Sequence, residues 1–187
     1  MFQDLHIIDF HAHFPIETNM FHGHGPEKRE VGPIENPVAL ARRAQRDQML
    51  ERTRHQWRMA FDFPEPEFEP QSSETQAERW VNELDRHGIE RIGFVTGQDN
   101  DELARVVKMY PDRIIGFAHH EITRPDAAEE LERAVKELGL KALKLLGPTV
   151  PVLINDKSLY PVWETCERLG VPVLCHFGMQ GGAGGVS

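Results

Sequence analysis

The chain has 187 residues, 40% of them hydrophobic, and its 30 acidic against 21 basic side chains give a formal net charge of −9. The hydrophobic fraction is sufficient for a buried core of ordinary size. The negative net charge argues against a nucleic-acid-binding or membrane-surface protein. No apolar run approaches the length of a membrane span, and Asp4 and Asp9 stand where a signal peptide would be cationic or apolar. Cys166 and Cys175 make no disulfide framework, so we expect a cytoplasmic location.

Five short apolar runs, rich in Ile, Val and Leu, have the composition of strands. In chain order they are 5–10, 91–96, 113–118, 140–146 and 171–177. Helical periodicity lies between them, each time followed directly by glycine or proline. The predicted helices are 78–87, 101–110 (with Asp99 and Asn100 as candidate caps), 125–138 and 158–169. This alternation predicts parallel βα units, of either a barrel or a doubly wound sheet.

Residues 14–72 interrupt the alternation, and we interpret them as an insertion after the first strand that covers the mouth of the barrel. Within it, 37–60 is predicted to be a helix with six arginines. One arginine could bind an anionic substrate through two parallel hydrogen bonds. For most of them we favour a solvated or subunit-contacting face, which leaves a homodimer open. The six are Arg42, Arg43, Arg46, Arg52, Arg54 and Arg58.

The first strand ends in His11-Ala12-His13. Side chains two residues apart on a strand point to the same face, so both imidazoles project from its C-terminal end, where parallel α/β folds build active sites. His176 occupies the same position at the fifth strand. Three neutral imidazoles can hold a divalent metal and leave one position open, which is typical of catalytic zinc. For the H-x-H pair alone, two histidines placed there by chance remain the alternative.

Four further side chains are candidates for catalytic roles. Asp9 is predicted to share the strand face of His11, where it could orient a histidine or instead cap nearby backbone. Lys144 lies near the end of the fourth strand and could bind a substrate carboxylate, neighbour the metal or reach solvent. His119 and His120 close the third strand, and alternation lets only one of them face the pocket.

Four blocks of this sequence resemble the amidohydrolase-2 type of metal-dependent enzymes, the relatives of aminocarboxymuconate-semialdehyde decarboxylase within the amidohydrolase superfamily. The blocks are IIDFHAH, DNDELARVVKMYPDRIIGFA, ELGLKALKLLGP and LYPVWETCERLGVPVLCHFG. The resemblance implies a (β/α)8 TIM barrel with one divalent metal, usually zinc, with manganese or iron as alternatives. It implies His11, His13 and His176 as the metal ligands.

The same resemblance implies a sixth-strand histidine and an eighth-strand aspartate, and neither strand is found in this sequence. A complete barrel needs about 250 residues. We therefore expect residues 1–187 to be a single, incomplete TIM-barrel domain that supplies the first five βα units and lacks part of the metal site.

In function, the resemblance implies an enzyme with a small-molecule carboxylate substrate. We expect a nonoxidative decarboxylase, a carboxy-lyase, of an unsaturated or aromatic carboxylic acid. Metal-dependent hydrolysis of an amide, ester or lactone is the alternative, because a metal lowers the pKa of its water toward about 7, and hydration ranks third. A different class is a non-enzymatic, flavodoxin-like domain with an open five-stranded doubly wound sheet, in which the histidines would be incidental.

Overall fold

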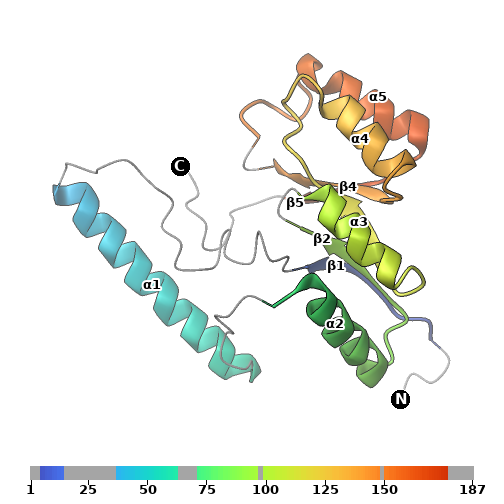
Figure 1. Ribbon diagram of the computed structural model, residues 1–187. Coiled ribbons are helices and arrows are strands. Elements are labelled where there is room, and N and C mark those ends of the chain that lie inside the picture. Colours follow the sequence, from blue (N-terminus) through green and yellow to red (C-terminus); the bar gives the residue numbers. More distant parts are fainter. Residues whose placement is uncertain (1–4, 15–36, 63–70, 97–98, 148–149, 177–187) are drawn as a thin grey trace.

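Five parallel strands form the centre of the computed structural model (Figure 1), which describes residues 5–14, 37–62, 71–96, 99–147 and 150–176. The strands are β1 (Ile8–His13), β2 (Arg91–Val95), β3 (Ile114–Ala118), β4 (Ala142–Leu146) and β5 (Val173–His176). All neighbouring pairs are parallel. The five predicted strands are confirmed, but β1 begins later than the apolar run and includes the H-x-H residues.

Helices connect the strands from β1 onward. They are α2 (Ser73–His87), α3 (Asn100–Met109), α4 (Ala127–Lys136) and α5 (Tyr160–Leu169), the last preceded by the 3-10 turn η2 (Lys157–Leu159). Gly88 and Gly170 adopt the left-handed conformation, with φ of 66° and 65°, and so end α2 and α5 as predicted. Helix α2 begins earlier than its apolar periodicity because the Ser72 side chain accepts a hydrogen bond from the Thr75 N–H.

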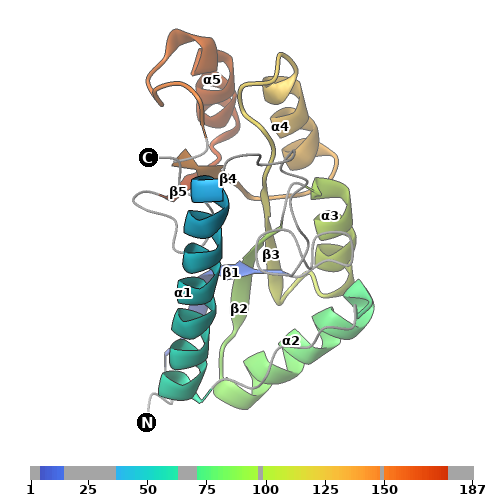
Figure 2. The same cartoon turned by 90° about the vertical axis from the view of Figure 1, so that its left-hand side faces the viewer.

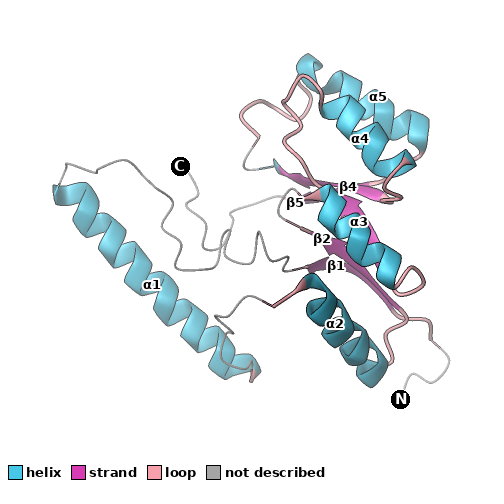
Figure 3. Ribbon diagram, in the orientation of Figure 1, coloured by secondary structure: helices cyan, strands magenta, loops and turns pink. Residues whose placement is uncertain are grey.

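The strand order decides between the two predicted folds. A doubly wound sheet reverses its strand order at a switch point, whereas β1 to β5 follow one another without a reversal. With this order, right-handed crossovers place all the connecting helices on one face of the sheet. Figure 3 shows α2, α3, α4 and α5 on one and the same face. The chain therefore forms a half-barrel of the TIM-barrel type, and the open doubly wound alternative is wrong.

Most of the hydrophobic core lies between the sheet and these helices. Its fully buried members include Ile92, Phe94, Leu103, Ile114, Leu131, Leu143 and Leu145. The inner face, meaning the sheet face opposite to α2–α5, carries a smaller cluster of Val95, Phe117 and Ala142. Cys166 and Cys175 are free thiols that pack into the helix-side core, as expected of small apolar residues.

Helix α1 (Pro37–Phe61) confirms the helix predicted within the insertion. Figures 1 and 2 show it on the side of the sheet that α3, α4 and α5 leave open. Arg42 and Arg52 are exposed and Arg58 is half-buried, whereas the other three arginine side chains lie outside the described residues. Coverage of the barrel mouth by 14–72 stays a prediction. Within the described ranges, no helix has both the length and the apolar character that a membrane span needs.

The N-terminus of α3 depends on one capping carboxylate. Asp99 Oδ1 accepts a hydrogen bond from the Glu102 N–H at 3.0 Å and complements the helix dipole. We expect Asp99→Ala to lower the free energy of unfolding by about 1 kcal/mol, and Asp99→Asn to retain most of that stability. Urea unfolding of the three proteins measures the difference. An alanine variant as stable as the parent would contradict the capping role.

Candidate functional site

Polar side chains gather on the inner face at the C-terminal ends of the strands, where parallel barrels build their active sites. Phe117 and Ala142 belong to the inner-face cluster. His119 and Lys144 lie two residues further along the same strand directions, so their side chains point to the same face. His176 is the last residue of β5. The sheet thus brings together residues from β1, β3, β4 and β5.

The central contact of the site joins His11 and Lys144. Lys144 Nζ lies 3.1 Å from His11 Nε2. An ammonium group can only donate, so His11 presents the lone pair of Nε2 to it. Lys144 is only 1% exposed, and its burial lowers the pKa of the amine. Among the residues that the structure describes, no carboxylate is hydrogen-bonded to this lysine.

The two imidazoles of the H-x-H pair lie side by side. The ring centroids of His11 and His13 are 5.1 Å apart, with planes inclined by 50°. The pKa of His11 is lowered, first by partial desolvation and then by the charges of Lys144 and His176. The negative charge of Asp9 partly offsets this lowering. In the described part of the chain, however, no three His, Cys, Asp or Glu side chains are grouped so as to hold a metal ion. The structure supplies the pair but does not assemble the three-imidazole cluster.

A β-bulge in β1 changes the position predicted for Asp9. From Asp9 to Ala12 the strand advances by three residues, while its partner β2 advances by two, from Ile92 to Phe94. The extra residue breaks the simple alternation that would put Asp9 on the face of His11. Asp9 Oδ1 instead accepts a hydrogen bond from the backbone N–H of His11 at 3.1 Å. Asp9 therefore binds the backbone beside His11, as in the second of the two predicted roles, the capping of nearby backbone. No contact between Asp9 and the imidazole of His11 is described.

His119 and His120 point to opposite sides of the sheet. The ring of His120 lies on the helix side, with Nε2 2.9 Å from the carbonyl oxygen of Ala127 in α4. The ring of His119 lies on the inner face, with Nδ1 2.7 Å from the carbonyl oxygen of Thr96. Of the two catalytic candidates, the structure thus places His119 in the site and His120 outside it.

Asn100 is a site residue that the sequence pattern marks only as a candidate helix cap. It is 4% exposed, and its Oδ1 accepts a hydrogen bond from the His119 N–H at 2.8 Å. Its Nδ2 donates to Glu130 Oε1 at 2.8 Å. The available signal was its place shortly after β2, in the first turn of α3, at the C-terminal end of the strands where barrels build active sites.

Burial lowers the pKa of both His119 and His120. In the unfolded chain, histidines take up protons near pH 6.5, so on acidification the unfolded state binds more protons than the folded state. We expect the free energy of unfolding to be constant above about pH 7 and to fall as the pH drops below about 6.5. Urea unfolding across this range measures the slope, which His120→Gln should reduce. An unchanged slope in that variant would contradict the assignment.

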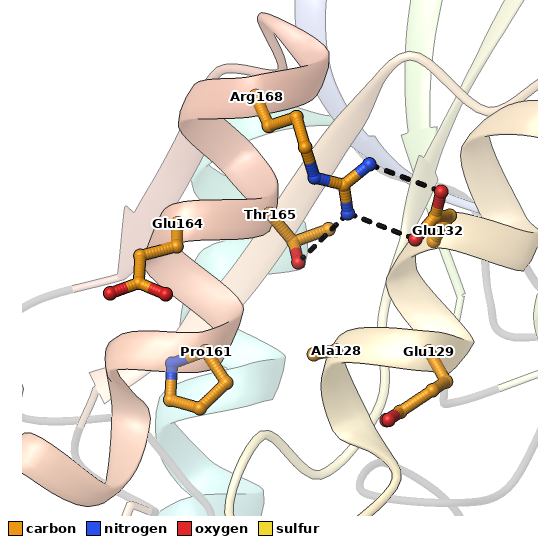
Figure 4. Close-up of a pocket in the computed structure, with 7 residues that line it drawn as sticks. All are labelled: Ala128, Glu129, Glu132, Pro161, Glu164, Thr165 and Arg168. Carbon is orange, nitrogen blue, oxygen red and sulfur yellow. Dashed lines mark hydrogen bonds and ion pairs between the residues drawn. The ribbon is translucent and has the colours of Figure 1, made fainter.

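A pocket lies between α4 and α5, on the helix layer (Figure 4). Arg168 crosses it and donates to both carboxylate oxygens of Glu132, at 3.1 and 2.9 Å. Arg168 and then Lys136 hold the pKa of Glu132 at about 2. These contacts tie the two helices together, and the pocket is built from the helices and not from the strand ends. We assign it a structural role.

The strand order, the one-sided helix layer and the polar residues at the C-terminal strand ends define part of a TIM-barrel enzyme fold. The chain belongs to the amidohydrolase family, whose sequence model matches residues 8–185. It is 33% identical over 124 residues to a gamma-resorcylate decarboxylase from Polaromonas sp., covering 53% of this chain and 38% of that protein. It is 35% identical over 78 residues to a 2-amino-3-carboxymuconate-6-semialdehyde decarboxylase from Dictyostelium discoideum, covering 41% and 22%.

The chain thus spans well under half the length of these curated relatives. Among solved structures, a probable 2-pyrone-4,6-dicarboxylic acid hydrolase from Acinetobacter baumannii has the same fold, with a TM-score of 0.55 at 17% identity over 92% of this chain and 50% of that one. A dihydroxybenzoic acid decarboxylase from Polaromonas sp. is 32% identical over 53% of this chain and 37% of that one, with a TM-score of 0.48. That structure contains bound manganese and an inhibitor, 2-nitroresorcinol.

Proposed function

We propose that this chain supplies the H-x-H pair and the carboxylate-binding lysine of a metal-dependent, nonoxidative decarboxylase of aromatic or unsaturated carboxylic acids. The observation that carries the proposal is the contact on the inner face between Lys144 and His11, in which a buried ammonium donates to the Nε2 lone pair of an imidazole. Two relatives named for the decarboxylation of gamma-resorcylate and of a carboxymuconate semialdehyde support this substrate class.

Lys144 would bind the carboxylate of the substrate. A buried ammonium without a counter-ion is costly, because the protein interior solvates charge poorly. A substrate carboxylate provides that counter-ion through a charge-assisted hydrogen bond. The same contact would hold the carboxylate in place while the bond between it and the adjacent carbon breaks, leaving the electron pair on that carbon for protonation.

A divalent metal would be held by His11, His13 and His176. The Nε2 lone pair of His11 already faces a cation, the Lys144 ammonium, so the type of donor fits a metal ion. When bound, the metal supplies a Lewis acid that withdraws electron density from a substrate oxygen. We propose zinc, and manganese is the alternative that the solved decarboxylase supports.

The proposal is tested by assaying the protein, loaded with zinc or manganese, against hydroxybenzoates, muconate-type acids and lactones. We expect CO2 release from at least one acid. Lys144→Met should lower kcat/KM for that acid by about 100-fold or more, because a buried charged partner is lost. Lys141→Met, which removes an exposed lysine just before β4, should change it little. Lactone turnover without CO2 release from any acid would overturn the proposal in favour of a hydrolase.

A further inference from the structure

We infer that His119 is a specificity-determining residue of this site, whose Nε2 accepts a hydrogen bond from a hydroxyl group of the bound acid. The residue would favour acids that carry a hydroxyl group over analogues that carry hydrogen in its place. The inference rests on the proposed function in one respect, which is that the carboxylate of the acid binds Lys144.

The contact with Thr96 fixes the tautomer of His119. Nδ1 lies 2.7 Å from the carbonyl oxygen of Thr96. A carbonyl oxygen can only accept a hydrogen bond, so Nδ1 carries the proton. Burial lowers the pKa of His119 and so favours the neutral ring. In a neutral ring with its proton on Nδ1, Nε2 holds a lone pair and acts only as an acceptor.

The Nε2 atom of His119 has no hydrogen-bond partner among the described residues. It is also not among their fully buried, unpartnered side-chain nitrogens, which include Nδ1 of His120. The ring shares the inner face with Lys144, whose charge also contributes to the lowered pKa of His119. An acid paired with Lys144 therefore has its other substituents on the side of the sheet where this lone pair lies.

The position of His119 is fixed by buried hydrogen bonds. Asn100 accepts from the His119 N–H and donates to Glu130, both at 2.8 Å, and Glu130 accepts from Arg133 Nε at 2.8 Å. His119, Asn100 and Thr96 are 8%, 4% and 4% exposed. These contacts join the end of β3 to α3 and α4. The acceptor is thus held in place before a ligand arrives, which reduces the ordering cost of binding.

A fixed acceptor discriminates because a ligand without a donor leaves it unpaired. A hydroxyl group on the acid donates to Nε2, whereas a C–H group at the same place desolvates the lone pair and offers nothing in return. Sites built to hydrogen-bond a substrate hydroxyl reject the analogue that lacks it. We therefore expect the site to prefer an acid with a hydroxyl donor at this place over the analogue that lacks only that donor.

A binding experiment separates this role from catalysis. The affinities of 2-, 3- and 4-hydroxybenzoate and of benzoate are measured by calorimetry for the parent, His119→Asn and His119→Gln. Asparagine keeps an N–H for the Thr96 carbonyl but has no acceptor at the Nε2 position, whereas glutamine can place its oxygen there. We expect the parent to prefer one hydroxybenzoate over benzoate by roughly tenfold. The preference should vanish in the asparagine variant and partly return in the glutamine variant.

An unchanged preference in His119→Asn would overturn the inference, and so would a parent protein that binds none of these acids or binds all of them equally. A preference that depends on His119 without release of CO2 from any acid would refute the proposed decarboxylase and support the inference. The two proposals therefore fail through different measurements.

Discussion

Replacing His11 with alanine should abolish most of the proposed metal binding and, with it, the proposed decarboxylation. His11 presents the Nε2 lone pair that already faces a cation in the site, and its ring lies beside that of His13. Removal of one imidazole from a chelating pair leaves a single neutral donor from this strand. We expect metal affinity to fall by at least about 100-fold, the upper end of what the loss of an outer-shell partner costs. Metal content after dialysis, measured by mass spectrometry, gives the result.

His6→Ala is the matched control for this substitution. His6 precedes the same strand, its side chain is 88% exposed, and it contacts Glu90. Its removal should leave the metal content unchanged. His176→Ala extends the test to the imidazole that lies outside the described pair, and a fall in metal content would support its place among the ligands. Equal metal content in the parent and in His11→Ala would show that His11 is not a metal ligand.

Replacing Leu131 with alanine should produce a large loss of stability. Leu131 lies in α4, is fully buried and belongs to the core between the sheet and the helices. The substitution removes buried apolar surface and leaves a cavity that the surrounding residues fill only partly. We expect the free energy of unfolding to fall by about 2–5 kcal/mol. Urea unfolding, followed by circular dichroism, measures the change.

Leu153→Ala provides the comparison, since it makes the same chemical change at a residue that is 77% exposed. Surface substitutions of this kind usually alter stability by no more than about 0.5 kcal/mol. If both variants lost the same stability, the helix-side core would not be the main source of the stability of this half-barrel.

Local sequence signals were sufficient for most of the secondary structure. Gly88 and Gly170 ended their helices as predicted, because a left-handed residue at that position depends only on the neighbouring backbone. The Asp99 cap of α3 is equally local. The face of Asp9 was not predictable in this way, because a one-residue bulge arises from the pairing of β1 with β2 and leaves no mark in the hydrophobic pattern.

The sequence by itself determined the alternation of strands and helices, the H-x-H pair and the ends of several helices, since each depends on residues that are close along the chain. The tertiary structure alone decided the strand order, the helix-side position of His120 and the partner of His11. Lys144 is 133 positions from His11, and only the order and register of the strands between them bring the two side chains together. Contacts between residues so far apart along the chain depend on tertiary packing, which local sequence patterns do not predict.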